Sequence, residues 1–364
     1  MDKEAQILQE IRMNPFITQQ QLANKMGISR SAVAGYIASL TRRGEIKGRA
    51  YILRDKSLVT CIGGANLDRK ARSKQKVHLH TSNPVTITES CGGVARNIAE
   101  NLGRLGCITS LISCVGDDKE GKWILNETKR FGVDVSQVWM LSTERTGTYT
   151  ALLDTDGEMV ISLADMEIYD KITPDMLGEK WSHIASSQVV FADTNFSEDC
   201  LRYLIDRCRV ENISLYVDPV SSAKARKLAP CLEGIDTILP NREEAELLAG
   251  MEIHSLSDCK EACGKIRKRG VNNVVVTLGK QGIFCSTPEE SEYLPAFKTE
   301  VVDVTGAGDA FASGVLYGVI RGESLLHACK IGLAAAALTL QTEHSVSPLL
   351  KPDQLEAYLE ERLS

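Results

Sequence analysis

Residues 304–311 read VTGAGDAF, and this stretch decides how the rest of the chain is interpreted. The run VVDVTGAGD (301–309) follows a predicted strand and precedes the apolar, helix-like run FASGVLYGVI (311–320). This order predicts a strand, a glycine turn and the N-terminus of a helix. Small residues at a helix N-terminus leave backbone N–H groups open to an anion, and the helix dipole favours negative charge there. We therefore expect Gly306, Ala307 and Gly308 to form an anion hole.

The acidic residue at this turn, Asp309, has two interpretations. A carboxylate beside a phosphate is repulsive unless it has a chemical role, such as accepting the proton of an attacking hydroxyl during phosphoryl transfer. An aspartate that merely caps the helix is the alternative. The whole string favours the first interpretation, so Asp309 is the candidate catalytic base.

Strand-like and helix-like runs alternate along the chain from about residue 58. Alternation of this kind predicts an α/β fold, with a mainly parallel sheet covered by helices on both faces. Ligands of such folds gather at the carboxyl ends of the strands. Polar residues or glycines fall at or just beyond the ends of apolar runs at Asp68, Asp193, Asp218, Asn241 and Gly279.

Length and composition set limits on the class of protein. A chain of 364 residues fits a large α/β domain plus a small one. The eleven cysteines are scattered and odd in number, which favours free thiols over disulfides or zinc. The charged N-terminus lacks the apolar core of a signal peptide, and the apolar stretch 331–340 is too short to cross a bilayer. We expect a soluble cytoplasmic protein with no membrane partner.

The first 57 residues differ in charge from the rest of the chain. They carry a net charge of +5, whereas the remainder carries −11. Helical spacing, candidate N-caps at Thr18 and Ser29, and a candidate hairpin over residues 44–53 occur in this order. The pattern resembles a winged helix-turn-helix domain, with residues 29–43 as its recognition helix. We therefore divide the chain into domains 1–57 and 58–364.

That resemblance implies binding of double-stranded DNA through the recognition helix and the wing. A helical dimerisation or docking module, whose basic residues form only a solvated face, is the alternative. The candidate DNA contacts are Ser29, Arg30, Ser31, Tyr36, Arg42, Arg43, Lys47 and Arg49.

The larger domain carries two specific signatures. CGGVARNIAENLGRLG (91–106) and DVTGAGDAFASG (303–314) resemble the glycine signatures of the ribokinase family of carbohydrate and nucleoside kinases, also called the PfkB family. The resemblance implies a ribokinase-like fold, with Asp309 as base and residues 306–308 as anion hole. It also implies an ATP-dependent phosphotransferase that acts on an alcohol group.

The same resemblance implies roles for further residues. Asn241 and Glu244 position Mg²⁺ through water, and Asp303 and Thr305 help to bind a monovalent cation, usually K⁺. The substrate-binding candidates are Asn66, Asp68, Gly92, Gly93, Asn97, Thr148, Asp165, Asp193 and Asp309. The ATP-binding candidates are Asn241, Thr277, Gly279, Gly282, Gly306 and Gly308.

The nature of the substrate depends on fewer residues. GGVARN (92–97) and SLADMEIYDKITPDML (162–177) resemble the pseudouridine kinases of this family, which implies phosphorylation of the 5′-hydroxyl of pseudouridine. Asp165, or Thr148 with Tyr149, then contacts the base, although Asp165 is equally interpretable as a turn residue. The alternatives are a ribose- or fructose-type sugar kinase, an inosine, adenosine or uridine kinase, and a ligand-sensing transcription regulator.

Two segments of alternating polar and apolar residues, 75–90 and 146–164, resemble the small β-sheet lid of this family. The lid closes over the sugar and expels water from the site. In the family it also often forms a dimer interface, so we expect a homodimer.

Overall fold

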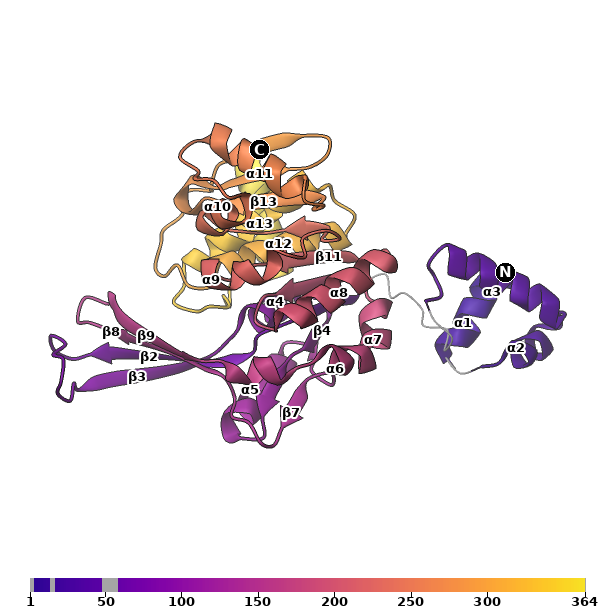
Figure 1. Cartoon of the computed structure of the whole chain (residues 1–364), viewed down its shortest axis with the longest axis horizontal. Helices are drawn as coiled ribbons and strands as arrows, with labels where there is room; N and C mark the ends of the chain where they lie inside the picture. Colours follow the sequence, from indigo (N-terminus) through magenta and orange to yellow (C-terminus); the bar gives the residue numbers. More distant parts are fainter. Residues whose placement is uncertain (1–2, 14–16, 48–57, 364) are drawn as a thin grey trace.

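The structure is a computed structural model that describes residues 3–13, 17–47 and 58–363. Its N-terminal segment forms three helices, α1 (Lys3–Met13), α2 (Gln19–Met26) and α3 (Arg30–Arg42), which lie together in Figure 1. The side chains of Thr18 and Ser29 cap α2 and α3, as predicted. Apolar side chains from all three helices pack into one small core. The tip of the predicted hairpin, with Gly48 and Arg49, lies outside the described residues.

A nine-stranded sheet forms the body of the larger domain, in the order β15-β14-β13-β12-β11-β10-β1-β4-β6. The strands from β13 to β6 in this order are parallel, whereas β14 and β15 form an antiparallel edge. The strands are β1 (Leu58–Ile62), β4 (Ile108–Ile112), β6 (Val133–Asp134), β10 (Val189–Asp193), β11 (Ser214–Asp218), β12 (Thr237–Ile238), β13 (Asn273–Thr277), β14 (Ile283–Ser286) and β15 (Ser291–Leu294).

Helices cover both faces of this sheet because successive strand residues point to opposite sides. In β1, Val59 and Cys61 join the core on one face, whereas Ile62 joins the core on the other. The first core is completed by α4 (Val94–Arg104), α5 (Lys119–Arg130), α12 (Ala307–Ile320), α13 (Leu325–Leu340) and α14 (Pro352–Leu363). The second is completed by α6 (Pro174–Glu179), α7 (Trp181–Ser186), α8 (Glu198–Val210), α10 (Arg242–Ala249) and α11 (Leu256–Arg267). The predicted α/β architecture is confirmed.

A four-stranded sheet in the order β3-β2-β8-β9 forms a lid that projects from the body (Figure 1). Its strands are β2 (Asn66–Ser73), β3 (Val85–Gly92), β8 (Thr148–Leu153) and β9 (Met159–Asp165). The predicted segments 75–90 and 146–164 contain most of β3 and β9 and all of β8 but omit β2, and residues 75–84 form a loop. A short pair, β5 (Cys114–Gly116) and β7 (Trp139–Leu141), lies apart from both sheets.

Other sequence expectations concern cysteines, metals and membranes. All eleven cysteines are free thiols, as predicted. Within residues 3–13, 17–47 and 58–363, no three His, Cys, Asp or Glu side chains gather closely enough to hold a metal ion by themselves. None of the helices in these ranges has the length and apolar character needed to span a bilayer.

Candidate active site

The first feature of the site is the loop after β1, which Asp193 holds against the N-terminus of α4. Oδ2 of Asp193 accepts hydrogen bonds from the backbone N–H groups of Gly64 (2.8 Å) and Ala95 (3.0 Å). Oδ1 accepts from the backbone and side-chain N–H groups of Asn195, both at 2.8 Å. With four donors and only 1% of its surface exposed, Asp193 holds the loop after β1 in place. Its assignment as a substrate-binding residue stays a prediction.

The lid begins at two predicted substrate ligands, Asn66 and Asp68. Nδ2 of Asn66 donates to Oδ1 of Asp68 at 2.6 Å, so the pair presents adjoining polar groups. The pairing of β2 with β3 brings Gly92 beside them, where a Cβ atom would meet the Asp68 carboxyl group at 2.2 Å. Glycine is therefore required at position 92 for the aspartate to lie there. Burial raises the pKa of Asp68 to about 6, despite the hydrogen bond from Asn66.

The predicted anion hole lies at the N-terminus of α12. Gly306 is the N-cap residue in a left-handed conformation (φ 79°), and a Cβ atom there would meet the carbonyl oxygen of Ser345 at 1.9 Å. No side chain caps this helix. Because the first N–H groups of a helix have no partner within it, the amides of its first turn remain suited to an anion. The structure thus places residues 306–308 at a helix N-terminus as predicted, and their role as an anion hole stays a prediction.

Asp309 lies in the first turn of α12 and joins it to α4. Nδ2 of Asn97, a residue only 5% exposed, donates to Oδ2 of Asp309 at 2.8 Å. Burial raises the pKa of Asp309 to about 7, and the charges of Asp193 and Asp68 add to this effect against the hydrogen bond from Asn97. A carboxylate with a pKa near neutrality is suited to accept a proton from a hydroxyl group.

Arg96 is a residue of this site that the sequence interpretation did not assign. Its Nη1 donates to Oδ1 of Asn97 at 2.9 Å, and its other bonds reach the Cys91 carbonyl, Thr128 and Glu100. The arginine is 3% exposed. With Oδ1 of Asn97 occupied, the Nδ2 group must face Asp309. The sequence signal was the arginine directly before Asn97 in GGVARN.

A second set of predicted residues meets where α10 begins and β13 ends. Asn241 and Glu244 form a reciprocal cap at the start of α10, in which Glu244 accepts from the backbone and side-chain N–H groups of Asn241, both at 2.8 Å. Thr277 at the end of β13 bridges to Asn241, and the turn that contains Gly279 and Gly282 follows. The structure therefore brings the predicted nucleotide and Mg²⁺ residues together.

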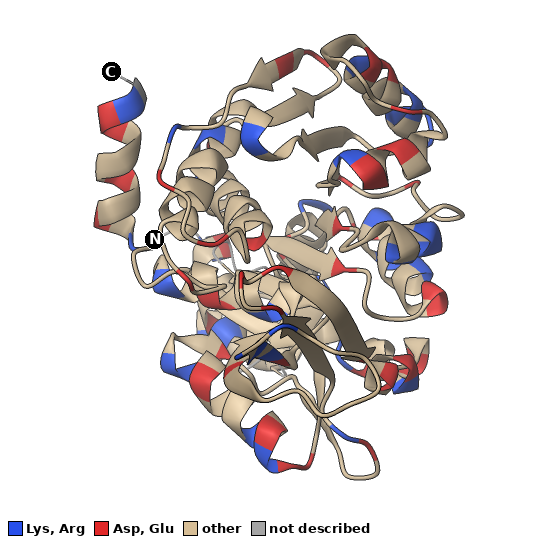
Figure 2. Ribbon diagram, turned by 90° about the vertical axis from the view of Figure 1, so that its left-hand side faces the viewer, with Lys and Arg blue, Asp and Glu red and all other residues tan. Residues whose placement is uncertain are grey.

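The residues around Glu244 fit a hydrated Mg²⁺. Burial, and next the charge of Glu244, raise the pKa of Asp218 well above its usual range, and burial raises that of Glu244. A cation would relieve this pair of acids. Each Glu244 oxygen already accepts one bond from Asn241, so its remaining lone pair suits a water of the ion. Several acidic segments (red) lie near the centre of Figure 2, which faces the lid side.

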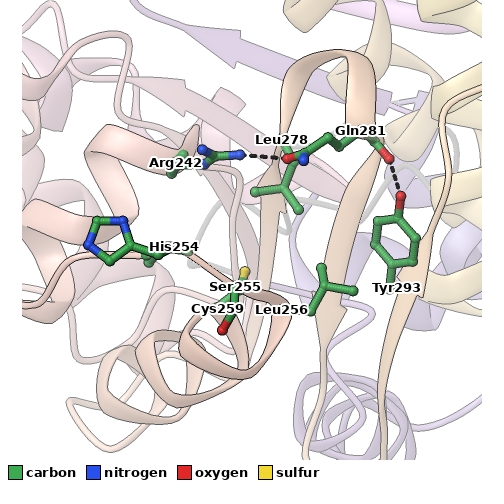
Figure 3. Close-up of a pocket in the computed structure, with 9 residues that line it drawn as sticks. Arg242, His254, Ser255, Leu256, Cys259, Leu278, Gln281 and Tyr293 are labelled. Carbon is green, nitrogen blue, oxygen red and sulfur yellow. Dashed lines mark hydrogen bonds between the residues drawn. The ribbon is translucent and has the colours of Figure 1, made fainter.

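A pocket of about 150 Å³ adjoins the turn after β13 and is shown in Figure 3. Nη2 of Arg242 donates to the Gln281 side chain at 2.6 Å, and the Tyr293 hydroxyl donates to the Gln281 carbonyl at 2.5 Å. Asp309 and residues 306–308 do not line it, so this pocket is not the site of the candidate base. Its lining residues are Arg242, Ile253, His254, Ser255, Leu256, Cys259, Leu278, Gln281 and Tyr293.

The lid register divides the predicted base-contacting residues between two faces. Paired residues of neighbouring strands point to the same face. Tyr149 pairs with Asp68, whereas Thr148 pairs with Leu67 and with Asp165. Thr148 and Asp165 therefore lie on the face opposite Asp68, and their assignment as substrate ligands stays a prediction. Tyr149 lies on the same face as Asp68.

The predicted DNA contacts are distributed over exposed parts of the N-terminal domain. Ser29, Arg30, Ser31 and Arg42 are exposed, and Tyr36 packs partly against the small core. Arg43 pairs with Glu4 at 2.6 Å and Glu45 at 3.1 Å, and Lys47 donates to the Glu211 carbonyl at 3.1 Å. Arg49 lies outside the described residues.

The parallel sheet, the anion-hole helix and its carboxylate define a phosphotransferase of the ribokinase-like class. The chain belongs to the pfkB family of carbohydrate kinases, whose model matches residues 56–352. A second model, for winged helix-turn-helix DNA-binding domains, matches residues 2–47. The ribokinase-like fold and the winged helix-turn-helix resemblance are thereby confirmed, whereas the domain bounds 1–57 and 58–364 stay a prediction.

Individual relatives agree with the family. The chain is 34% identical to the uncharacterised sugar kinase YeiI of Escherichia coli K12 over 355 residues, which cover 97% of each protein. It is 34% identical to the pseudouridine kinase of the same strain over 297 residues, or 81% of this chain and 94% of that one. The Arabidopsis thaliana ribokinase, solved with ribose and ATP, shares the fold with a TM-score of 0.74 and 23% identity, over 84% of this chain and 98% of that one.

Proposed function

We propose that this protein transfers the γ-phosphoryl group of ATP to the 5′-hydroxyl group of pseudouridine, with Asp309 as the general base. The observation that carries the proposal is the position of this carboxylate, in the first turn of α12 and bonded by Asn97, with a pKa of about 7. At neutral pH a large fraction of the carboxylate is ionised, and it accepts the hydroxyl proton as the oxygen attacks phosphorus.

The other residues of the chain bind and orient the reactants. Asn66 and Asp68 offer a donor and an acceptor to adjacent sugar hydroxyls, and Tyr149 lies on the same lid face. The backbone N–H groups at residues 306–308 stabilise charge on the transferring group. Thr277, Gly279 and Gly282 shape the turn that holds the nucleotide.

Asn241 and Glu244 would hold Mg²⁺ through water. When bound, the ion neutralises charge on the phosphate oxygens of ATP. Because Asn241 and Glu244 lie at the start of α10, Asp309 on α12 would stay free for proton transfer.

Pseudouridine is favoured over other acceptors by the GGVARN string and by the similarity to a pseudouridine kinase along most of the larger domain. The similarity to a sugar kinase along both domains supports a sugar as the second candidate. A site built to bond hydroxyl groups rejects ligands that lack them, so the two candidates are separable by rate.

Purified protein should be incubated with ATP and Mg²⁺ and with pseudouridine, uridine, inosine, adenosine, ribose or fructose, beside an Asp309→Asn control. We expect pseudouridine to be phosphorylated fastest, with the activity lost in the control. A faster rate with a free sugar or another nucleoside would replace the substrate and retain the kinase. Tight binding of one compound without turnover of any would favour a ligand-sensing regulator.

We also propose that the N-terminal domain binds double-stranded DNA through the first turn of α3. Ser29, Arg30 and Ser31 are exposed there, where a recognition helix contacts base edges. A gel-shift assay against a random duplex library, with competitor DNA, tests this. If no sequence is enriched above competitor, the domain does not act as a specific DNA reader.

A homodimer formed through the lid completes the proposal. One row of paired residues crosses all four lid strands on the face opposite Asp68: Ile87, Ala71, Leu152 and Ile161. The side chains of Ile87 and Ile161 are 58% and 53% exposed. Exposed apolar side chains gathered on one sheet face are typical of an interface, and a second copy of the lid offers a matching row.

A further inference from the structure

Lys70 extends from the lid to the loop that leads into the anion hole. It lies on β2, on the same face as Asn66 and Asp68, because alternate strand residues share a face. Its Nζ lies 2.9 Å from Oδ2 of Asp303 and 3.4 Å from Oγ1 of Thr305. Asp303 and Thr305 are the residues for which the family resemblance implied a monovalent cation.

Each side-chain oxygen at this position already has a donor beside it. Oδ2 of Asp303 accepts from Lys70, and Oδ1 accepts from the backbone N–H (2.8 Å) and the hydroxyl (2.7 Å) of Thr305. The Thr305 hydroxyl donates to Asp303 and faces the Lys70 ammonium with its lone pairs. A second cation at the Asp303 carboxylate would meet the lysine's charge at close range. The side chains present therefore do not fit an added K⁺.

We infer that the Lys70 ammonium group takes the place of the monovalent cation, so that this enzyme works without K⁺. An ammonium group is itself a compact monovalent cation with three donors, and it satisfies the carboxylate at hydrogen-bond distance. Lys70 is a positioning residue. It neutralises Asp303 and contacts Thr305, the residue directly before Gly306, and so holds the loop that leads into the anion hole. The part of the inference that concerns activity rests on the proposed kinase function.

The charge state of Asp303 is consistent with this arrangement. The Lys70 ammonium group and the Asp303 carboxylate form an ion pair at 2.9 Å, so the acid has a cation beside it without an added ion. The pair is only partly buried, with 37% and 26% of the side-chain surfaces exposed, so Lys70 provides local order and not a large share of the stability.

The contact between Lys70 and Asp303 has a second consequence, because Lys70 lies on the lid strand β2. The positive charge beside Asp303 belongs to a lid side chain, whereas a free ion would bind Asp303 independently of the lid. Placement of the lid over the sugar and ordering of the anion-hole loop are thus linked through one side chain. In this enzyme the loop is ordered when β2 lies over the site.

The test compares the wild type with Lys70→Met and with the matched control Arg72→Met. Arg72 lies on the same strand and face, but it donates within the lid to the Thr155 carbonyl at 3.0 Å. The melting temperature and the initial rate are measured in KCl, NaCl and choline chloride at equal ionic strength. The melting temperature is measured without substrate, so it tests the inference even if no compound is phosphorylated.

We expect the wild type and Arg72→Met to give the same values in all three salts. Lys70→Met should lose several-fold in rate in choline chloride and regain part of it in KCl, with a melting temperature that rises selectively with KCl. A wild type that requires K⁺, or a Lys70→Met protein that behaves identically in the three salts, would overturn the inference.

A double variant keeps the test decisive if Lys70→Met folds poorly. Asp303→Asn removes the charge that Lys70 neutralises, so Lys70→Met with Asp303→Asn should recover the melting temperature lost in the single variant and lose its response to KCl. If the double variant still responds selectively to KCl, the cation binds elsewhere and the inference is wrong.

Discussion

Asn97 donates to Asp309 across the junction of α4 and α12, and Arg96 fixes the direction of that hydrogen bond. Arg96 bonds Oδ1 of Asn97 at 2.9 Å, which leaves Nδ2 for Oδ2 of Asp309 at 2.8 Å. An amide turned the other way would place its oxygen against the carboxylate. The order of these two neighbours in GGVARN therefore lowers the proton affinity of the candidate base, against the larger effect of burial.

The first prediction concerns Arg96→Met. The amide of Asn97 loses its fixed orientation, and the charge of Arg96, which lowers the pKa of Asp309, is removed. A hydrogen bond to an ionised group contributes about 1.5–3 kcal/mol, so the acidic limb of the pH–kcat/KM profile should move up by about one pH unit or more. KM at high pH should change little.

Arg104→Met is the matched control for this prediction. Arg104 also pairs with Glu100, at 2.8 Å, but has no hydrogen bond to Asn97. Its pH profile should coincide with that of the wild type. Equal displacement of both profiles would mean that the buried Glu100 network, and not the orientation of Asn97, controls the base.

The second prediction is that Asp309→Asn lowers the activity and raises the stability above pH 7. The rate should fall by about 10²- to 10⁴-fold with the loss of the base. Because the folded pKa of about 7 lies above the unfolded value, the folded wild type binds more protons between these values and loses stability as pH rises through that range. The asparagine variant should therefore melt higher than the wild type above pH 7, and this difference should vanish near about pH 4. An equal difference at every pH would assign the gain to packing.

The third prediction separates the substrate carboxylate from the base. Burial raises the pKa of Asp68 to about 6, and its ionised form is the acceptor for sugar hydroxyls. KM should rise as pH falls below about 6, whereas kcat should follow Asp309 near 7. Asp68→Asn should raise KM at neutral pH and remove its pH dependence. A variant in which only kcat changes would place Asp68 in the chemical step.

The strand–helix alternation and the two glycine signatures were enough to predict the larger domain and the positions of Asp309, Asn97 and Asn241, because these features depend on local sequence. The lid was harder to predict. The strand β2 begins within GGANLD (63–68), directly after the glycine turn that follows β1. The sequence there did not indicate that β2 pairs with β3 and β8. One residue of register decides whether Thr148 or Tyr149 faces the substrate, and register is a property of strand pairing.

Contacts between residues that lie far apart in the sequence were also not predicted. Asp193 stands at a strand end like a ligand, but four donors, which include Gly64 and Ala95, take up its oxygens. Lys70 was not singled out in the sequence, and its partner Asp303 is 233 residues away. Local sequence patterns carry no information on such pairs.

The fourth prediction concerns DNA affinity and salt. Arg30 is exposed at the start of α3, and Arg30→Ala should weaken binding and reduce the slope of log affinity against log salt by about one if Arg30 contacts a phosphate group. Lys25→Ala is the control, because Lys25 on α2 is paired with Glu10 at 2.6 Å. Fluorescence anisotropy over a range of KCl concentrations measures both. An unchanged slope for Arg30→Ala would remove it from the phosphate contacts.

The fifth prediction tests the apolar row on the lid. Ile161→Lys places a charge within the proposed interface, next to its paired residue Leu152. The variant should elute as a monomer at concentrations at which the wild type is a dimer, because a buried lysine at the interface would lack a partner. Val210→Lys is the matched control: Val210 is 72% exposed at the end of α8, far from the lid in sequence and outside it in the fold.

Analytical ultracentrifugation over a range of concentrations distinguishes the outcomes of this last test. A monomeric Ile161→Lys protein beside a dimeric Val210→Lys protein would place the interface on the lid face opposite Asp68. Because Lys70 and Asp68 lie on the other face of the same sheet, the monomer should also show a raised KM if dimerisation holds the lid in place. A wild type that is monomeric at every concentration, or an Ile161→Lys protein that remains a dimer, would show that the lid does not join two copies.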